Sequence, residues 1–181
     1  SSDVCSSDLG AKFPGALGNS LKVEVCSTAT AFNTGGTAGA AWAYAGEFDK
    51  APTTSDYAAK FNASAADELH IVVIDAGGLI SGTKNTVLEK FAFVSQASDA
   101  LKNDGTSNYY KNVINNESKY IYWLDHFNAL STPPGYLTNA GQAASTAITF
   151  DTETTILPYT FTGGADGDTV ASAAISTGID L

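Results

Sequence analysis

The side chains best suited to acid–base chemistry lie in one apolar stretch, residues 69–75. His70 stands inside this stretch, and Asp75 ends it, followed by Ala76 and the pair Gly77-Gly78. An imidazole and a carboxylate held together can transfer protons near neutral pH. If the stretch is a strand, however, two residues five apart point to opposite faces. The pattern therefore favours a hydrogen-bonded structural histidine and a turn-forming aspartate, with an acid–base enzyme as an alternative.

The other candidates for chemistry are few. His126 follows an aromatic segment beside Asp125, and two histidines with Cys26 give no zinc-ligand spacing. Residues 166–168, Asp-Gly-Asp, match part of a calcium loop but lack its spaced acids and its terminal glutamate. Cys26 has no basic neighbour in the sequence, which predicts a structural or half-exposed thiol. The sequence predicts no catalytic residue, no cofactor and no metal site.

The elements that would position these side chains are mainly strands. Four are predicted, at residues 21–27, 68–75, 87–94 and 119–125. Residues 21–27 alternate between apolar and polar, which indicates a strand with one solvent-exposed face. Residues 68–75 are apolar at both alternating positions, which indicates a central strand covered on both sides. In the third strand, Phe91 and Phe93 are predicted to face the same way.

Two short helices and one long loop complete the prediction. Residues 52–55 are expected to cap a helix at 56–61, and Ser107 a helix at 108–116. Residues 28–41 are rich in Gly, Ala and Thr and are predicted to form a flexible surface loop. A short strand is also allowed at residues 147–150.

Together these elements predict an α+β fold. It would be a mainly antiparallel or mixed β-sheet with short helices packed on one face, a two-layer sandwich. The short link between residues 68–75 and 87–94 favours an antiparallel pair. The link to residues 119–125 contains a helix and is long enough for a crossover, so a mixed sheet stays open.

Length and charge exclude several classes of protein. The chain has 181 residues, of which 44% are hydrophobic, and this suits one domain or slightly more with a packed core. Nineteen acids against nine bases give a net charge of −10. An acidic surface gains nothing from counterion release, so no nucleic-acid partner and no anionic membrane partner is expected. No apolar run reaches the length of a transmembrane helix.

Six segments occur in a fixed order between residues 67 and 126. They are DELHIVVID, a Gly-Gly turn, ISGTKNTVLEKF, SQASDA, DGTSNYYKNVIN and SKYIYWLDH. In this order they resemble the middle of a contractile tail sheath protein of myovirus-type bacteriophages. Looser resemblance extends to the segments that begin at Phe13, Phe48 and Leu157. The turn after Asp75 is less acidic than the family's turn, so a charged contact there is not implied.

The resemblance implies a domain organisation. Residues 10–155 would be the middle, outer domain of a sheath subunit, and residues 156–181 the truncated start of the following core domain. We therefore expect the chain to be an internal fragment. Residues 1–9 repeat the triplet Ser-Ser-Asp, which predicts translated adapter sequence, with a flexible Ser-rich tail as the alternative.

The resemblance also implies a structural function and no enzymatic one. Sheath subunits stack in rings around a tail tube and contract to drive the tube through the host envelope. The implied partners are other sheath subunits and the tail tube protein, within a virion tail assembled in the host cytoplasm. Expressed alone, the chain is expected to be a soluble monomer. The second hypothesis is a β-rich binding or adhesion module of a surface protein, using Trp42, Tyr44 and Tyr159 as exposed aromatic contacts.

Overall fold

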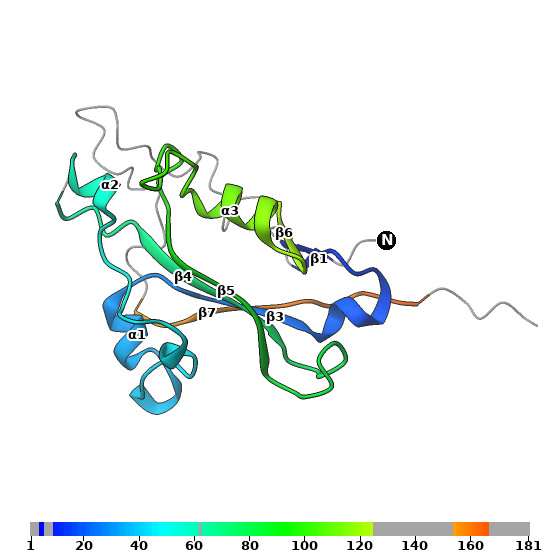
Figure 1. Cartoon of the computed structure of the whole chain (residues 1–181). Coiled ribbons are helices and arrows are strands. Elements are labelled where there is room, and N and C mark those ends of the chain that lie inside the picture. Colours follow the sequence, from blue (N-terminus) through cyan, green and yellow to red (C-terminus); the bar gives the residue numbers. More distant parts are fainter. Residues whose placement is uncertain (1–3, 6–8, 62, 125–153, 167–181) are drawn as a thin grey trace, which may run out of the picture.

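The computed structural model describes residues 4–5, 9–61, 63–124 and 154–166, and at its centre is a four-stranded sheet (Figure 1). The strands, in spatial order, are β5 (Thr86–Ser95), β4 (Glu68–Asp75), β3 (Leu21–Cys26) and β7 (Leu157–Thr160). Every neighbouring pair is antiparallel. The predicted α+β class is confirmed, as is the antiparallel pairing of the second and third predicted strands.

Strand β4 is central because both of its faces are apolar. All eight of its residues are buried. Leu69, Ile71 and Val73 pack into the larger core, while Val72 and Ile74 pack into a second core on the opposite face. The sheet therefore needs cover on both sides, as predicted for this strand.

One face of the sheet is covered by α3 (Tyr110–Glu117) and a small antiparallel sheet (Figure 1). The small sheet contains β1 (Val4–Cys5), β2 (Leu9–Ala11) and β6 (Ile121–Trp123). The predicted strand at 119–125 is thus shorter than expected and lies outside the main sheet. Its buried residues, Ile121 and Trp123, pack against α3 and the main sheet, while Tyr122 is 46% exposed.

The opposite face is covered by residues 29–50, here called the covering segment (Figure 1). Its first part was predicted to be a flexible loop, and that prediction is wrong. Helix α1 (Ala29–Thr34) begins there because Thr28 Oγ1 accepts a hydrogen bond from the Ala31 N–H at 3.0 Å. Short 3₁₀ turns follow at Thr37–Gly39 and Ala45–Glu47, and a third precedes β3 at Gly15–Ser20.

The covering segment also changes the environment of β3. The face with Lys22, Glu24 and Cys26 was predicted to be exposed to solvent, but Glu24 is 8% exposed and Cys26 is fully buried. Trp42 and Phe48 lie over this face and exclude water from it. Alternation in one strand cannot reveal a cover supplied by a distant segment, which is why the prediction is wrong.

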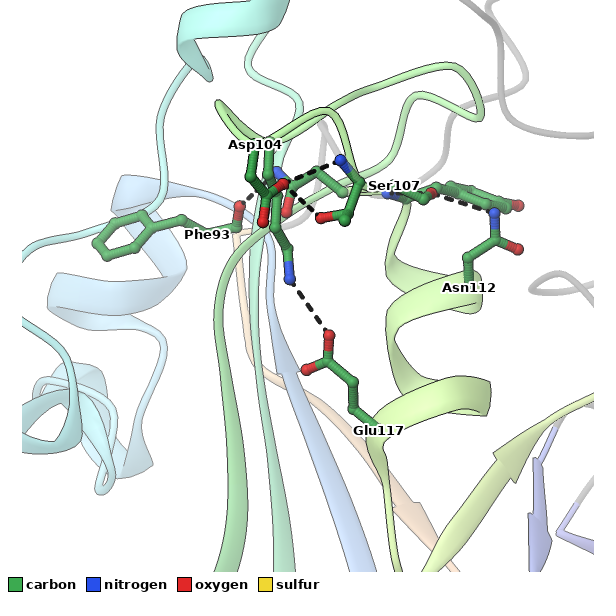
Figure 2. Close-up of polar contacts among 9 residues, drawn as sticks. Phe93, Asp104, Ser107, Asn112 and Glu117 are labelled. Carbon is green, nitrogen blue, oxygen red and sulfur yellow. Dashed lines mark hydrogen bonds and ion pairs between the residues drawn. The ribbon is translucent and has the colours of Figure 1, made fainter.

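The other helices differ in how they begin. Helix α2 (Asp56–Ala59) starts as predicted, with Ser55 Oγ accepting from the Ala58 N–H at 3.1 Å. Helix α3 starts two residues later than predicted, and Ser107 is not its cap. The Ser107 hydroxyl instead accepts hydrogen bonds from the Tyr109 N–H at 3.3 Å and from Asn112 Nδ2 at 3.1 Å (Figure 2).

A β-bulge in β5 separates Phe91 from Phe93, which were predicted to face the same way. The register with β4 shifts between Leu69 and Ile71, and Phe93 has a φ of 55°. An extra residue in one strand reverses the direction of the side chains beyond it. Phe91 therefore packs into the larger core, whereas the Phe93 ring contacts His70 on the opposite face, the one under the covering segment.

The apolar run near residue 157 forms the edge strand β7. It pairs with β3 from Leu157 opposite Val25 to Thr160 opposite Lys22. The first residues of the predicted core-domain portion, 156–181, therefore belong to the same sheet as residues 10–155. The strand allowed at residues 147–150 lies outside the described residues.

Candidate functional site

Asp75 is fully buried, and its carboxylate holds the turn that follows β4. Five hydrogen bonds reach it: from Ser20 Oγ (2.5 Å), the N–H groups of Gly78 (2.8 Å), Ile80 (2.9 Å) and Ser81 (2.6 Å), and Ser81 Oγ (2.8 Å). Burial alone would raise the pKa of this carboxyl group, but the donated hydrogen bonds outweigh it and hold the pKa well below its usual range. Asp75 is therefore ionised at neutral pH, and it forms the turn as predicted.

His70 is also fully buried, and both of its ring nitrogens are bonded. Nδ1 accepts from the Phe93 N–H at 3.2 Å, so the ring proton must lie on Nε2, which donates to the Lys50 carbonyl at 2.8 Å. The Phe48 ring stacks on the imidazole, with centroids 4.1 Å apart. Burial lowers the pKa of His70, so the ring is neutral at pH 7.

The structure does not bring the two predicted acid–base candidates together. His70 contacts the covering segment and the bulge of β5, whereas Asp75 faces the turn at the end of β4. Five residues of extended strand, about 16 Å, separate them. Neither side chain has a free polar atom aimed at the other, so the described geometry offers no proton-transfer pair.

The remaining candidates add no reactive site to the described residues. His126, Asp125 and the second half of residues 166–168 lie outside them. Asp166 Oδ1 accepts from the Ala16 N–H at 2.9 Å, which is a structural contact. Within the described ranges, no group of three His, Cys, Asp or Glu side chains is placed to hold a metal ion.

Cys26 is the other candidate nucleophile, and its environment suppresses reactivity. Burial raises the pKa of the thiol to about 12, and Sγ donates to the Thr28 carbonyl at 3.6 Å. We predict that a thiol reagent at pH 8 labels Cys26 only after unfolding, since thiolate and access are both lacking. Mass spectrometry of a Cys5→Ser variant, with and without urea, measures this. Rapid labelling of the native variant would contradict it.

Three further buried carboxylates, those of Glu24, Asp67 and Glu68, were not identified from the sequence as structural anchors. Glu24 accepts a hydrogen bond from Trp42 Nε1 at 2.6 Å, and this bond connects the covering segment to β3. Within β3, Glu24 also pairs with Lys22 Nζ at 2.5 Å. Asp67 accepts from the Ser55 N–H at 2.9 Å and from the Ser55 and Ser95 hydroxyls. The only sequence signal was the acids themselves, because their partners come from distant segments.

A cleft of about 300 Å³ lies between α2 and the loop that precedes α3, lined in part by Lys50, Phe93, Lys102 and Asn108. Two of its polar side chains, those of Lys102 and Asn108, already have partners. Asn108 Nδ2 donates to the Phe93 carbonyl at 3.0 Å, and Lys102 Nζ lies 3.2 Å from Glu117 Oε1 (Figure 2). These contacts brace the loop that precedes α3 against β5 and α3.

No family model and no curated protein matches the chain. Among the helices of the described ranges, none combines the length and the apolar character needed to cross a bilayer.

Proposed function

We propose that the chain is part of a structural subunit of a phage contractile tail sheath, which surrounds the tail tube and contracts to drive it through the host envelope. The proposed partners are other sheath subunits and the tail tube protein, in the virion tail. Support comes from the six ordered segments between residues 67 and 126 that resemble this family. These ordered segments carry the proposal, and the internal hydrogen bonds that occupy His70 and Asp75 weigh against the acid–base alternative.

A sheath subunit needs no bond chemistry. Contraction is driven by the difference in contact free energy between two packings of rigid domains. A passive domain of this kind must keep its shape while its neighbours change. The buried anchors Asp75, Asp67 and Glu24 fix turns and layers of the fold to one another, and this internal fixing suits such a role.

The first test is the state of assembly. We expect the 181-residue chain alone to sediment as a monomer, since its net charge of −10 opposes self-association. The complete reading frame that contains it, expressed with the adjacent tube gene, should form hollow tubes with helical order in negative-stain electron micrographs. Tubes from this chain alone, or none from the complete reading frame, would contradict the proposal.

The adhesion-module hypothesis loses its main support. Trp42 and Tyr159 were predicted to be exposed, but they are only 3% and 7% exposed, and Tyr44 is half-buried. The Trp42 indole donates a hydrogen bond to Glu24 and stacks on the ring of Phe48, with centroids 5.4 Å apart. A glycan array is the direct comparison, and the sheath proposal expects no bound glycan.

A further inference from the structure

One buried imidazole joins three separate parts of the fold. His70 belongs to β4, its Nδ1 accepts from the Phe93 N–H in β5, and its Nε2 donates to the Lys50 carbonyl at the end of the covering segment. Two aromatic rings of the covering segment also meet it. Phe48 stacks at 4.1 Å with an interplanar angle of 6°, and Phe32 lies edge-on at 5.9 Å.

The covering segment has few other polar attachments to the sheet. Trp42 Nε1 donates to Glu24 at 2.6 Å, and Lys90 Nζ contacts the Glu47 carbonyl at 2.9 Å. The Lys90 contact is solvent-exposed, so it contributes little. The layer on the opposite face, with α3 and β6, makes no described hydrogen bond to His70. A change at the imidazole should therefore act on one layer only.

A second proton on the imidazole would disrupt this arrangement. Nδ1 would become a donor that faces the Phe93 N–H donor, and the ring would hold a charge inside an apolar site. The positive charge of Lys50 also disfavours a positive charge on the ring. Glu68 lies two residues away on β4, but its carboxylate is bonded to the Thr53 N–H at 2.9 Å and the Thr53 hydroxyl at 3.1 Å. Cys26 lies opposite His70 on β3, and because burial raises the pKa of its thiol to about 12, it stays uncharged over this pH range. The rings that contact the imidazole are those of Phe32, Phe48 and Phe93.

We propose that His70 is an acid-sensitive attachment point, at which protonation of Nδ1 releases the covering segment from the sheet while the α3 layer stays packed. This inference goes beyond the sheath proposal and does not depend on it. Because burial lowers the pKa of His70, the attachment is fully present above the ordinary histidine pKa of about 6.5 and is lost as the pH falls below it.

Hydrogen exchange from pH 7 to pH 5 tests the proposal on the full chain. After correction for the intrinsic exchange rate, the opening equilibrium of residues 29–50 should rise by up to about tenfold per pH unit below about pH 6.5, since the open form binds one more proton. Amides of α3 should keep their protection. Equal loss of protection in both layers, or none in residues 29–50, would overturn the proposal.

Two variants make the test specific to one residue. His70→Gln should abolish the pH dependence of the covering segment, whereas the matched control His126→Gln should retain it. Persistence in His70→Gln would overturn the proposal. If His70→Gln does not fold, the His126→Gln variant still decides the question, because its NMR titration reports a single imidazole. A midpoint below about 6.5 is expected, and a midpoint at or above it would overturn the proposal.

Discussion

Replacing Asp75 with asparagine should lower the free energy of unfolding by about 3 to 5 kcal/mol, since at least two buried donors lose an acceptor at about 1 to 3 kcal/mol each. An amide offers one acceptor oxygen, so its NH₂ group would face either the Ser20 hydroxyl and the Gly78 N–H or the N–H groups of Ile80 and Ser81. Urea denaturation at pH 7, followed by tryptophan fluorescence, measures the change. An asparagine variant as stable as the wild type would show that the carboxylate is not what holds the turn.

The matched control for this change is Ser81→Ala. It removes one hydroxyl donor but keeps the Ser81 N–H bond to Asp75, so we expect a loss of only about 1 kcal/mol. The wild type should also lose stability in acid. The pKa of Asp75 is held below its usual range, so its contribution is present above the ordinary aspartate pKa of about 3.9 and lost as the pH falls through and below that value. The asparagine variant should lack this part of the acid dependence.

Replacing Trp123 with alanine should cost about 3 to 5 kcal/mol, the range for truncating a large buried aromatic side chain. The indole is 1% exposed, and its ring lies 4.9 Å from that of Tyr110, so its removal leaves a cavity between β6 and α3. Far-UV circular dichroism during urea unfolding is the suitable measurement, because the change removes one of only two tryptophans.

The neighbouring residue supplies the control for Trp123→Ala. Tyr122 is on the same short strand but on its outer face, where Lys12 Nζ lies 4.3 Å from the centroid of its ring. Tyr122→Ala should therefore cost no more than about 1 kcal/mol, the value of an exposed cation–π contact. Equal losses in the two variants would mean that β6 does not present alternate faces to the core and to solvent.

The strands were predictable where the signal was local. Residues 68–75 combine β-branched composition with apolar character on both faces, and they form the buried centre of the sheet. The covering segment was missed because its Gly, Ala and Thr content is typical of loops. Its helix α1 depends on the cap at Thr28 and on packing of Ala31 against Val72 and Ile74. The bulge at Phe93 was missed because strand periodicity assumes an unbroken register.

In the candidate site, too, the features with a local sequence signal were predictable and those that depend on distant segments were not. The turn-forming role of Asp75 followed from its place before two glycines, since the Gly78, Ile80 and Ser81 donors are nearby in sequence. The fourth donor residue, Ser20, is supplied by a distant segment and was not predictable. A structural role for His70 was predicted, but its bonding partners depend on tertiary folding that brings the end of the covering segment to the bulge.

The pairing of β3 with β7 has a consequence for synthesis of the protein on the ribosome. Strand β3 is synthesised early, but the edge of β3 that pairs with β7 stays unpaired until Thr160, the partner of Lys22, has been synthesised. Translation adds about 5 to 20 residues each second, so nascent chains spend seconds with β3, β4 and β5 complete and one edge of the sheet open. Unpaired strand edges are templates for another chain, and adjacent ribosomes on one messenger RNA supply such chains. A gene that stopped before Leu157 would leave that edge open permanently.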